Sequence, residues 1–141
     1  MTSLESSHKA NHQFVIQTLV LLLGVSVVGS NAFLMSPVMH DISSSLSSSV
    51  GQTARAVAAY GGALALTGLF LTGYVQRFGY KTALMVSGTV LTLGILSTGL
   101  AGNWQMLLAS QAVAGLGAGI LLPTLYSMTA EVAPKGKESA T

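Results

Sequence analysis

The chain has 141 residues, of which 50% are hydrophobic and 7% are charged, with a net charge of +2 and no cysteine. Soluble domains contain about 25% charged residues, so this composition excludes an ordinary soluble domain, and the lack of cysteine excludes disulfides and cysteine-based metal sites. The sequence pI near 9.2 does not indicate nucleic-acid binding, because the basic residues lie in separate connections and form no patch.

The chain opens with a polar segment, residues 1–13, which we expect to be a disordered cytoplasmic tail. Residues 14–39 form the first long apolar stretch, and about 20 such residues cross a bilayer core as a helix. Ser30-Asn31-Ala32 is a tolerable signal-peptide cleavage site, but the apolar run continues well beyond it, which favours an uncleaved span. Pro37 lies within this stretch and favours a kink.

A serine-rich outer connection, residues 40–53, follows the first span. Its serines and Thr53 are expected to cap the start of the second span. Asp41 lies at the outer end of the first span, where it is a candidate cation or proton site. The alternative is that its carboxylate caps the next helical turn.

Three more apolar stretches complete the transmembrane region: residues 54–75, 82–101 and 104–130. The sequence therefore predicts an all-α membrane protein with four transmembrane helices over residues 14–130, followed by a cytoplasmic segment, residues 131–141. Asn103 nearly fills the last connection, so the third and fourth helices must be antiparallel neighbours. Pro123 lies within the fourth stretch and predicts a second kink.

Small residues recur four positions apart, which is the spacing that brings membrane helices into close contact. The default interpretation is generic helix packing. These residues are Ser26 and Ser30, then Ala59, Ala63 and Thr67, then Gly115 and Gly119.

Basic residues alternate between the two sides of the predicted membrane. Five lie on one side and Arg55 alone lies at the margin of the other. By the positive-inside rule, both termini and the middle loop are cytoplasmic, as expected for a multi-pass protein of a bacterial inner membrane. The five are Lys9, Arg77, Lys81, Lys135 and Lys137.

No His, Asp or Glu lies near the middle of a predicted span, although such groups usually mark proton relays. Asn31, Tyr60, Gln111 and Tyr126 are the polar residues that could face a substrate path, or they could bond neighbouring helices to one another. The sequence has no phosphate loop, metal constellation or nucleophile–base pair, so we expect neither an enzyme nor a cofactor.

The connection between the second and third spans, residues 73–81, is the most specific stretch. On its own it predicts a basic anchor with a tight turn. It resembles the signature loop of the major facilitator superfamily, Gly-x-Leu-Ala-Asp-Arg-x-Gly-Arg-Arg/Lys, of which Arg77, Gly79 and Lys81 match the arginine, the glycine and the final basic residue. Gln76 replaces the aspartate. Gly73 lies one position too close to the loop, Thr72 occupies the glycine position, and Tyr80 replaces the first of the two final basic residues.

The fourth stretch is similar to the helix-four pattern of the same family, Arg-x-x-x-Gly-x-Gly-Ala-Gly. Gly115, Gly117, Ala118 and Gly119 match, and Gln111 replaces the arginine. The end of the first stretch, from Pro37 through residues 41–46, resembles helix one of drug- and sugar-efflux members, and residues 133–140 resemble the loop before helix five. The resemblance covers residues 14–141.

This resemblance implies a secondary transporter that exports a small solute, with the lipid bilayer, the solute and protons as its partners. In the family the signature loop clasps the other six-helix half, and the helix-four arginine is associated with proton coupling. Gln76 and Gln111 carry no charge, which weakens both expectations. The family fold has twelve helices, so the chain is expected to be a partial or truncated form that needs its remainder or a partner subunit.

Two other functions stay open at this point. The chain could be an inactive remnant or a membrane interaction subunit without transport activity. It could also be a dimeric four-helix small multidrug exporter, but that design needs a carboxylate within the first span, and this span has none before Asp41.

Overall fold

The computed structural model describes residues 3–132, which form helices joined by short turns and contain no strand. In chain order the helices are α1 (Ser3–Leu34), α2 (Met39–Ser45), α3 (Val50–Phe70), α4 (Thr72–Gln76), α5 (Tyr80–Gly99) and α6 (Trp104–Val132).

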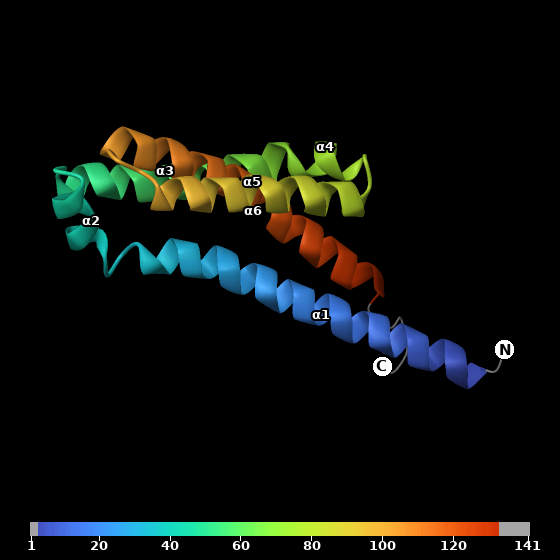
Figure 1. Cartoon of the computed structure of the whole chain (residues 1–141). Helices are drawn as coiled ribbons and strands as arrows, with labels where there is room; N and C mark the ends of the chain where they lie inside the picture. Colours follow the sequence, from blue (N-terminus) through green and yellow to red (C-terminus); the bar gives the residue numbers. More distant parts are fainter. Residues whose placement is uncertain (1–2, 133–141) are drawn as a thin grey trace, which may run out of the picture.

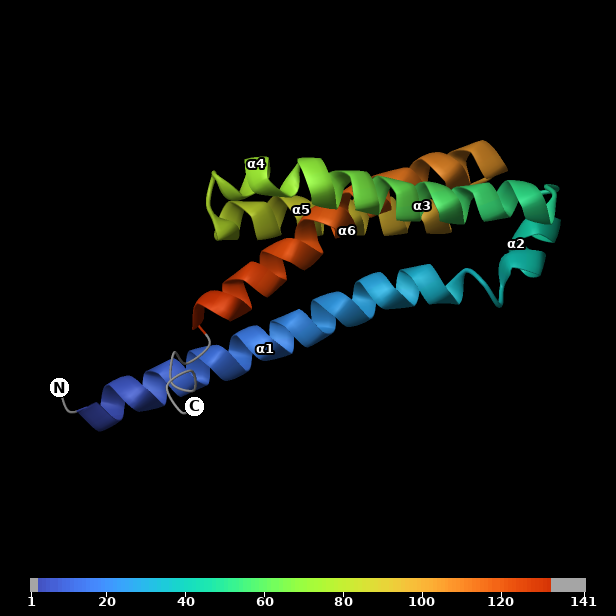
Figure 2. The same cartoon turned by 180° about the vertical axis from the view of Figure 1, so that it is seen from behind.

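Helix α6 is the centre of the arrangement. It packs against α3 and α5, and these three helices run side by side (Figures 1 and 2). In the most apolar part of α6, 56% of the residues are buried, against 22% in the corresponding part of α5 and 6% in that of α1. Helix α1 diverges from the other three along much of its length, and its main contact is with α6 (Figure 2). The fold is therefore a tight three-helix unit with a loosely attached fourth helix.

Glycines on α6 explain why the three helices can approach so closely. A Cβ at Gly119 would lie 2.5 Å from the Leu64 carbonyl oxygen of α3, and a Cβ at Gly115 would collide with the Tyr60 carbonyl oxygen. Gly117 points the other way, where a Cβ would lie 2.5 Å from the Leu91 nitrogen of α5. Alternating glycines thus bring the backbones of two different helices against α6.

Two of the predicted small-residue series meet at this interface. The Cβ atoms of Ala63 and Thr67 on α3 lie opposite Gly115 and Gly119 of α6, so the expected close packing is confirmed there. Ser26 and Ser30 of the third series are exposed.

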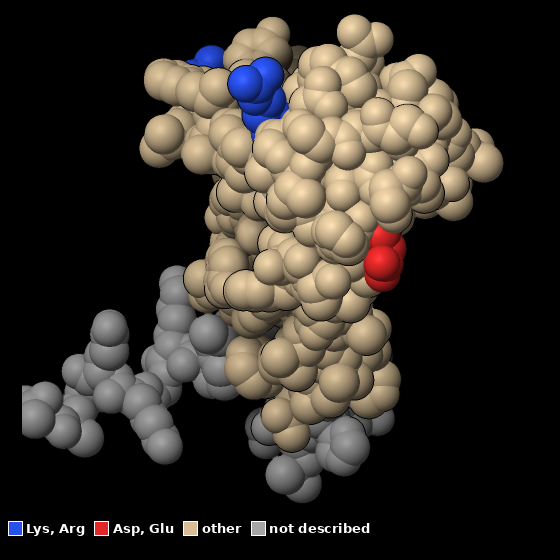
Figure 3. Space-filling view, turned by 90° about the vertical axis from the view of Figure 1, so that its left-hand side faces the viewer, with Lys and Arg blue, Asp and Glu red and all other residues tan. Residues whose placement is uncertain are grey.

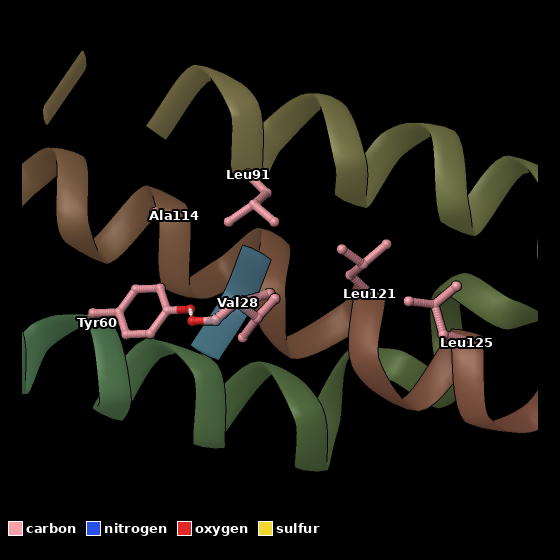
Figure 4. Close-up of a cluster of buried hydrophobic side chains, with 7 residues drawn as sticks. Val28, Tyr60, Leu91, Ala114, Leu121 and Leu125 are labelled. Atoms are coloured by element: carbon pink, nitrogen blue, oxygen red, sulfur yellow. Dashed lines mark hydrogen bonds between the residues drawn. The ribbon is translucent and has the colours of Figure 1, made fainter. Parts of the chain in front are cut away.

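The hydrophobic core lies where the helices meet. Figure 4 shows Leu91 of α5 and Leu121 and Leu125 of α6 at this junction, with Tyr60 of α3 pointing toward Val28 of α1. The Tyr60 hydroxyl donates to the Val28 carbonyl oxygen over 3.2 Å. This contact is one of the few that attach α1 to the three-helix unit.

Three described helices are long and apolar enough to cross a membrane: residues 11–34 of α1, α5, and residues 104–130 of α6. Helix α3 has 21 residues but is not among them, because Gln52, Arg55 and the glycine pair Gly61-Gly62 lower its mean hydropathy. The structure is thus an all-α chain with three candidate spans, and the fourth span stays a prediction.

The helix bounds correct several sequence expectations. Helix α1 begins at Ser3, so residues 3–13 are helical where we expected a disordered tail. It ends at Leu34, and Pro37 lies in the turn before α2, because proline's ring disfavours a helical conformation in the residue before it. The predicted second span is divided at Leu71 into α3 and α4. Pro123 does lie inside α6, which changes direction in its C-terminal half (Figure 1).

The helix starts agree with the capping expectation in part. Ser49 caps α3 in a capping box with Gln52, and the Asn103 side chain accepts from the Met106 N–H at 2.8 Å at the start of α6. Asp41 makes no capping hydrogen bond; it lies exposed in the first turn of α2, whose N-cap is Val38. The capping alternative for Asp41 is therefore wrong.

Substituting Gly115 with alanine should weaken the fold. The added methyl group must push α3 away from α6, which we expect to lower the free energy of unfolding by about 1–3 kcal/mol. Gly88 on α5 is the matched control, since a Cβ there meets nothing within 4 Å. Gly88→Ala should be neutral or slightly stabilising. Unfolding by SDS titration in mixed micelles, followed by circular dichroism, measures both; equal effects would contradict the packing argument.

Candidate functional site

A polar network in the interior joins four helices. The Asn31 side chain of α1 donates to the Gln111 side-chain oxygen of α6 over 3.4 Å. Gln111 in turn donates to the Thr98 hydroxyl of α5 over 3.0 Å, and Thr98 lies 3.2 Å from the Ser110 hydroxyl. Tyr60 of α3 donates to the carbonyl oxygen of Val28, which lies on α1 one turn before Asn31. Three of the four predicted path residues, Asn31, Tyr60 and Gln111, are therefore neighbours.

Gln111 is the central member of this network. It is 1% exposed, and its amide oxygen and nitrogen each have a partner, which a buried amide requires. A buried charge is far more costly than a buried amide, and the network contains no carboxylate that could pair with the arginine usual in the resembled family. Gln111 thus suits an uncharged interior.

Tyr126, the fourth predicted path residue, lies elsewhere. It is 56% exposed and lines an apolar groove of about 570 Å³ between α3 and α6, beside Pro123. The groove contains no charged side chain. Its other lining residues are Leu64, Ala65, Gly68, Leu69, Gly119, Leu122 and Ser127.

The loop between α4 and α5 makes a tight turn at Gly79. The φ angle of Gly79 is +94°, in the region that glycine alone adopts readily, which explains the glycine at this position. Arg77 and Lys81 are exposed and make no ion pair with any described residue. Gly73 is also exposed, and a Cβ there would meet nothing within 4 Å.

Two side chains of α4 reach α6 from this loop. The Thr72 hydroxyl donates to the Gly119 carbonyl oxygen over 3.0 Å, and the Gln76 amide donates to the Thr124 hydroxyl over 3.5 Å. Gln76, expected to act in a gating loop, is thus bonded to the bend of α6. Sequence reasoning missed Thr72 and Thr124 as contact residues; the available signal was Pro123, which must leave the Gly119 carbonyl without its helical partner.

The opposite end of the molecule carries Asp41. Figure 3 looks onto this end, which is almost uncharged apart from isolated blue and red side chains. The Asp41 carboxylate is exposed and has no partner among the described residues. Those residues bring no group of three or more His, Cys, Asp or Glu together.

Comparison with known proteins identifies the family. The model of the Major Facilitator Superfamily matches residues 21–141. The chain belongs to this superfamily. It is also 26% identical over 127 residues to a protein of Bacillus subtilis (strain 168) named "Uncharacterized MFS-type transporter YwfA". The match covers 89% of this chain and 31% of that protein, so the chain spans about a third of this relative. A comparison with solved structures gives no match.

Membership explains the two motifs that suggested it. The signature-loop positions lie at the α4–α5 turn, and the helix-four glycines lie at the contacts of α6 with α3 and α5. The chain is accordingly an integral membrane protein of a transporter family. Thr98 and Ser110, which complete the network around Gln111, had no distinctive signal in the sequence.

Replacing Gln111 with leucine should loosen α1. The change removes the acceptor of the Asn31 amide and the donor to Thr98, at about 1 kcal/mol in total for hydrogen bonds in a membrane. Gln105→Leu is the control, because Gln105 is exposed on the same helix. Spin labels at Ser30 and Leu116, both exposed, would report a wider distance distribution for Gln111→Leu alone. Unchanged distributions would show that the network does not hold α1.

Proposed function

We propose that this chain supplies the first four transmembrane helices of a secondary transporter that exports a small solute. The observation that carries the proposal is the family match over residues 21–141. The network of Asn31, Tyr60 and Gln111 supports a substrate path along α1, since this helix is the least covered of the candidate spans. The side chains of this network carry no charge, which favours a neutral or weakly polar solute over an ion.

We further propose that the α4–α5 loop takes part in gating. Its exposed Arg77 and Lys81 are available to acceptors on other helices of a complete transporter, and Gly79 fixes the turn that presents them. We also assign Gln76 and Gly73 to the proposed gating loop. The neutral Gln76 makes the clasp weaker than an aspartate would, because charged hydrogen bonds are about twice as strong. Asp41, exposed at the other end, is proposed as an outer-mouth cation or proton site.

The proposed topology places both termini in the cytoplasm of a bacterial cell, with four spans in the inner membrane. The exposed basic residues Arg77 and Lys81 lie at one end of the bundle, and the nearly uncharged surface of Figure 3 lies at the other. This distribution is the one that the positive-inside rule favours.

Cysteine labelling tests this topology, because the chain has no native cysteine. Ser7 and Ser139 should be protected in intact cells, whereas Ser45 of α2, which is exposed, should react with an impermeant maleimide. The three serines are replaced one at a time, and labelling after permeabilisation controls for reactivity. External labelling at Ser7 or Ser139 would overturn the topology.

A flux measurement tests the transport function. Everted vesicles from cells that express the chain in its natural genetic context should accumulate an exported solute when a proton gradient is imposed, with ethidium and a radiolabelled hexose as the two probes. The purified 141-residue chain in liposomes should give no saturable flux, because alternating access needs two parts that rock against each other. Gradient-driven flux from the purified chain would contradict that reasoning and favour a dimeric exporter. Vesicles that move neither probe would count against export of these two solute classes.

A further inference from the structure

We propose that Thr72 supplies the hydrogen bond that Pro123 removes from α6, so that α4 and the bend of α6 form one hinge unit. In a regular helix the N–H of residue 123 would bond to the Gly119 carbonyl oxygen. Proline has no N–H, and this carbonyl needs another donor. The Thr72 hydroxyl occupies that place at 3.0 Å, from a different helix.

Because the Gly119 carbonyl is buried, it needs this replacement donor. Gly119 is buried, and Thr72 is only 6% exposed. Within a membrane no water can satisfy an orphaned carbonyl, and a neighbouring side chain has to do so. A Cβ built at Gly68 of α3 would lie 3.4 Å from the same Gly119 oxygen, so α3 covers the carbonyl and leaves Thr72 as its donor.

The alternative acceptor for Thr72 is already satisfied. The Thr72 hydroxyl also lies 3.3 Å from the Thr67 carbonyl oxygen, but that oxygen accepts the Leu71 N–H at 2.9 Å. A hydroxyl has a single proton to donate. The Gly119 carbonyl oxygen is closer and lacks a helical donor, and both facts assign the Thr72 proton to it.

A second contact crosses the bend on the other side of the proline. Gln76, one turn after Thr72, donates to the Thr124 hydroxyl, which itself donates to the Ile120 carbonyl oxygen over 2.7 Å. Helix α4 therefore contacts α6 both before and after Pro123.

These two contacts connect the α4–α5 loop to the C-terminal part of α6, which follows Pro123. Helix α4 follows α3 after a single turn residue, Leu71, whose backbone keeps its hydrogen bonds to Thr67 and Val75. If α4 leaves α6, the Gly119 carbonyl loses its partner, which makes an intermediate position costly. Resting on the proposed transport function, the hinge unit would let a displacement of the signature loop change the bend of α6.

A double-mutant cycle tests the hydrogen-bond substitution in the purified chain. Thr72→Val, which keeps the shape and removes the hydroxyl, should lower the ratio of folded to unfolded protein about fivefold to tenfold in SDS titration. Thr72→Ser, which keeps the hydroxyl, should cause a smaller loss. With Pro123→Ala the backbone N–H returns, and Thr72→Val should then change the ratio less than about twofold. Equal losses with and without Pro123 would overturn the proposal.

A second measurement keeps the proposal testable if Pro123→Ala does not fold. Labelling glycine with ¹³C at the carbonyl and isoleucine with ¹⁵N marks two pairs in this sequence, Gly94-Ile95 and Gly119-Ile120. Thr72→Val should move the Gly119 carbonyl resonance, Thr72→Ser should move it little, and the Gly94 resonance is the internal control. An unmoved Gly119 resonance in Thr72→Val would overturn the proposal. Neither measurement depends on flux, so a failed transport assay leaves both informative.

Discussion

The rest of the structure depends on the close backbone contact of α6 with its two neighbours. Without side chains at Gly115 and Gly119, the carbonyls of α3 come into direct contact with α6, and Gly117 does the same for α5. In a membrane the hydrophobic effect gives little preference for one helix pairing over another, so packing and interhelical hydrogen bonds decide which faces meet. The glycine pattern therefore fixes both the neighbours of α6 and its rotation. That rotation in turn carries Gln111 into the interior and the Gly119 carbonyl toward Thr72.

Helix α1 is held in a different way. Its span is 6% buried, and its polar contacts with the other helices run through Asn31 and the Val28 carbonyl oxygen. Interhelical hydrogen bonds in membranes contribute roughly 0.6 kcal/mol each, far less than an extended close-packed interface. The molecule thus combines a closely packed three-helix unit with a helix that is sparsely attached to it.

Hydropathy and spacing predicted much of the fold, because long apolar runs in a membrane leave few alternatives to helices. The α5 and α6 bounds lie within two residues of the predicted spans. The first span was placed too far along the chain because apolar residues continue to Met39, whereas Pro37 and the turn around it end α1 at Leu34. The break at Leu71 had no distinctive sequence signal; the structure places it next to Thr72, whose hydroxyl bonds to α6.

The sequence predicted which residues belong to the candidate site better than it predicted which of them contact one another. Asn31, Tyr60 and Gln111 stood out as polar residues in apolar runs, but Asn31 and Gln111 are 80 positions apart, and no helical period relates them. Tyr126 had the same polarity and lies by a separate groove. Gln111 and Tyr126 differ in which way they face once the glycines of α6 are packed against α3 and α5. Thr124 and Leu125, just beyond Pro123, still face the core at 0% and 3% exposed, whereas Tyr126 is 56% exposed and lines the groove between α3 and α6. Pro123 lies between the part of α6 that builds the network and the part that bonds to Gln76 of α4 through Thr124.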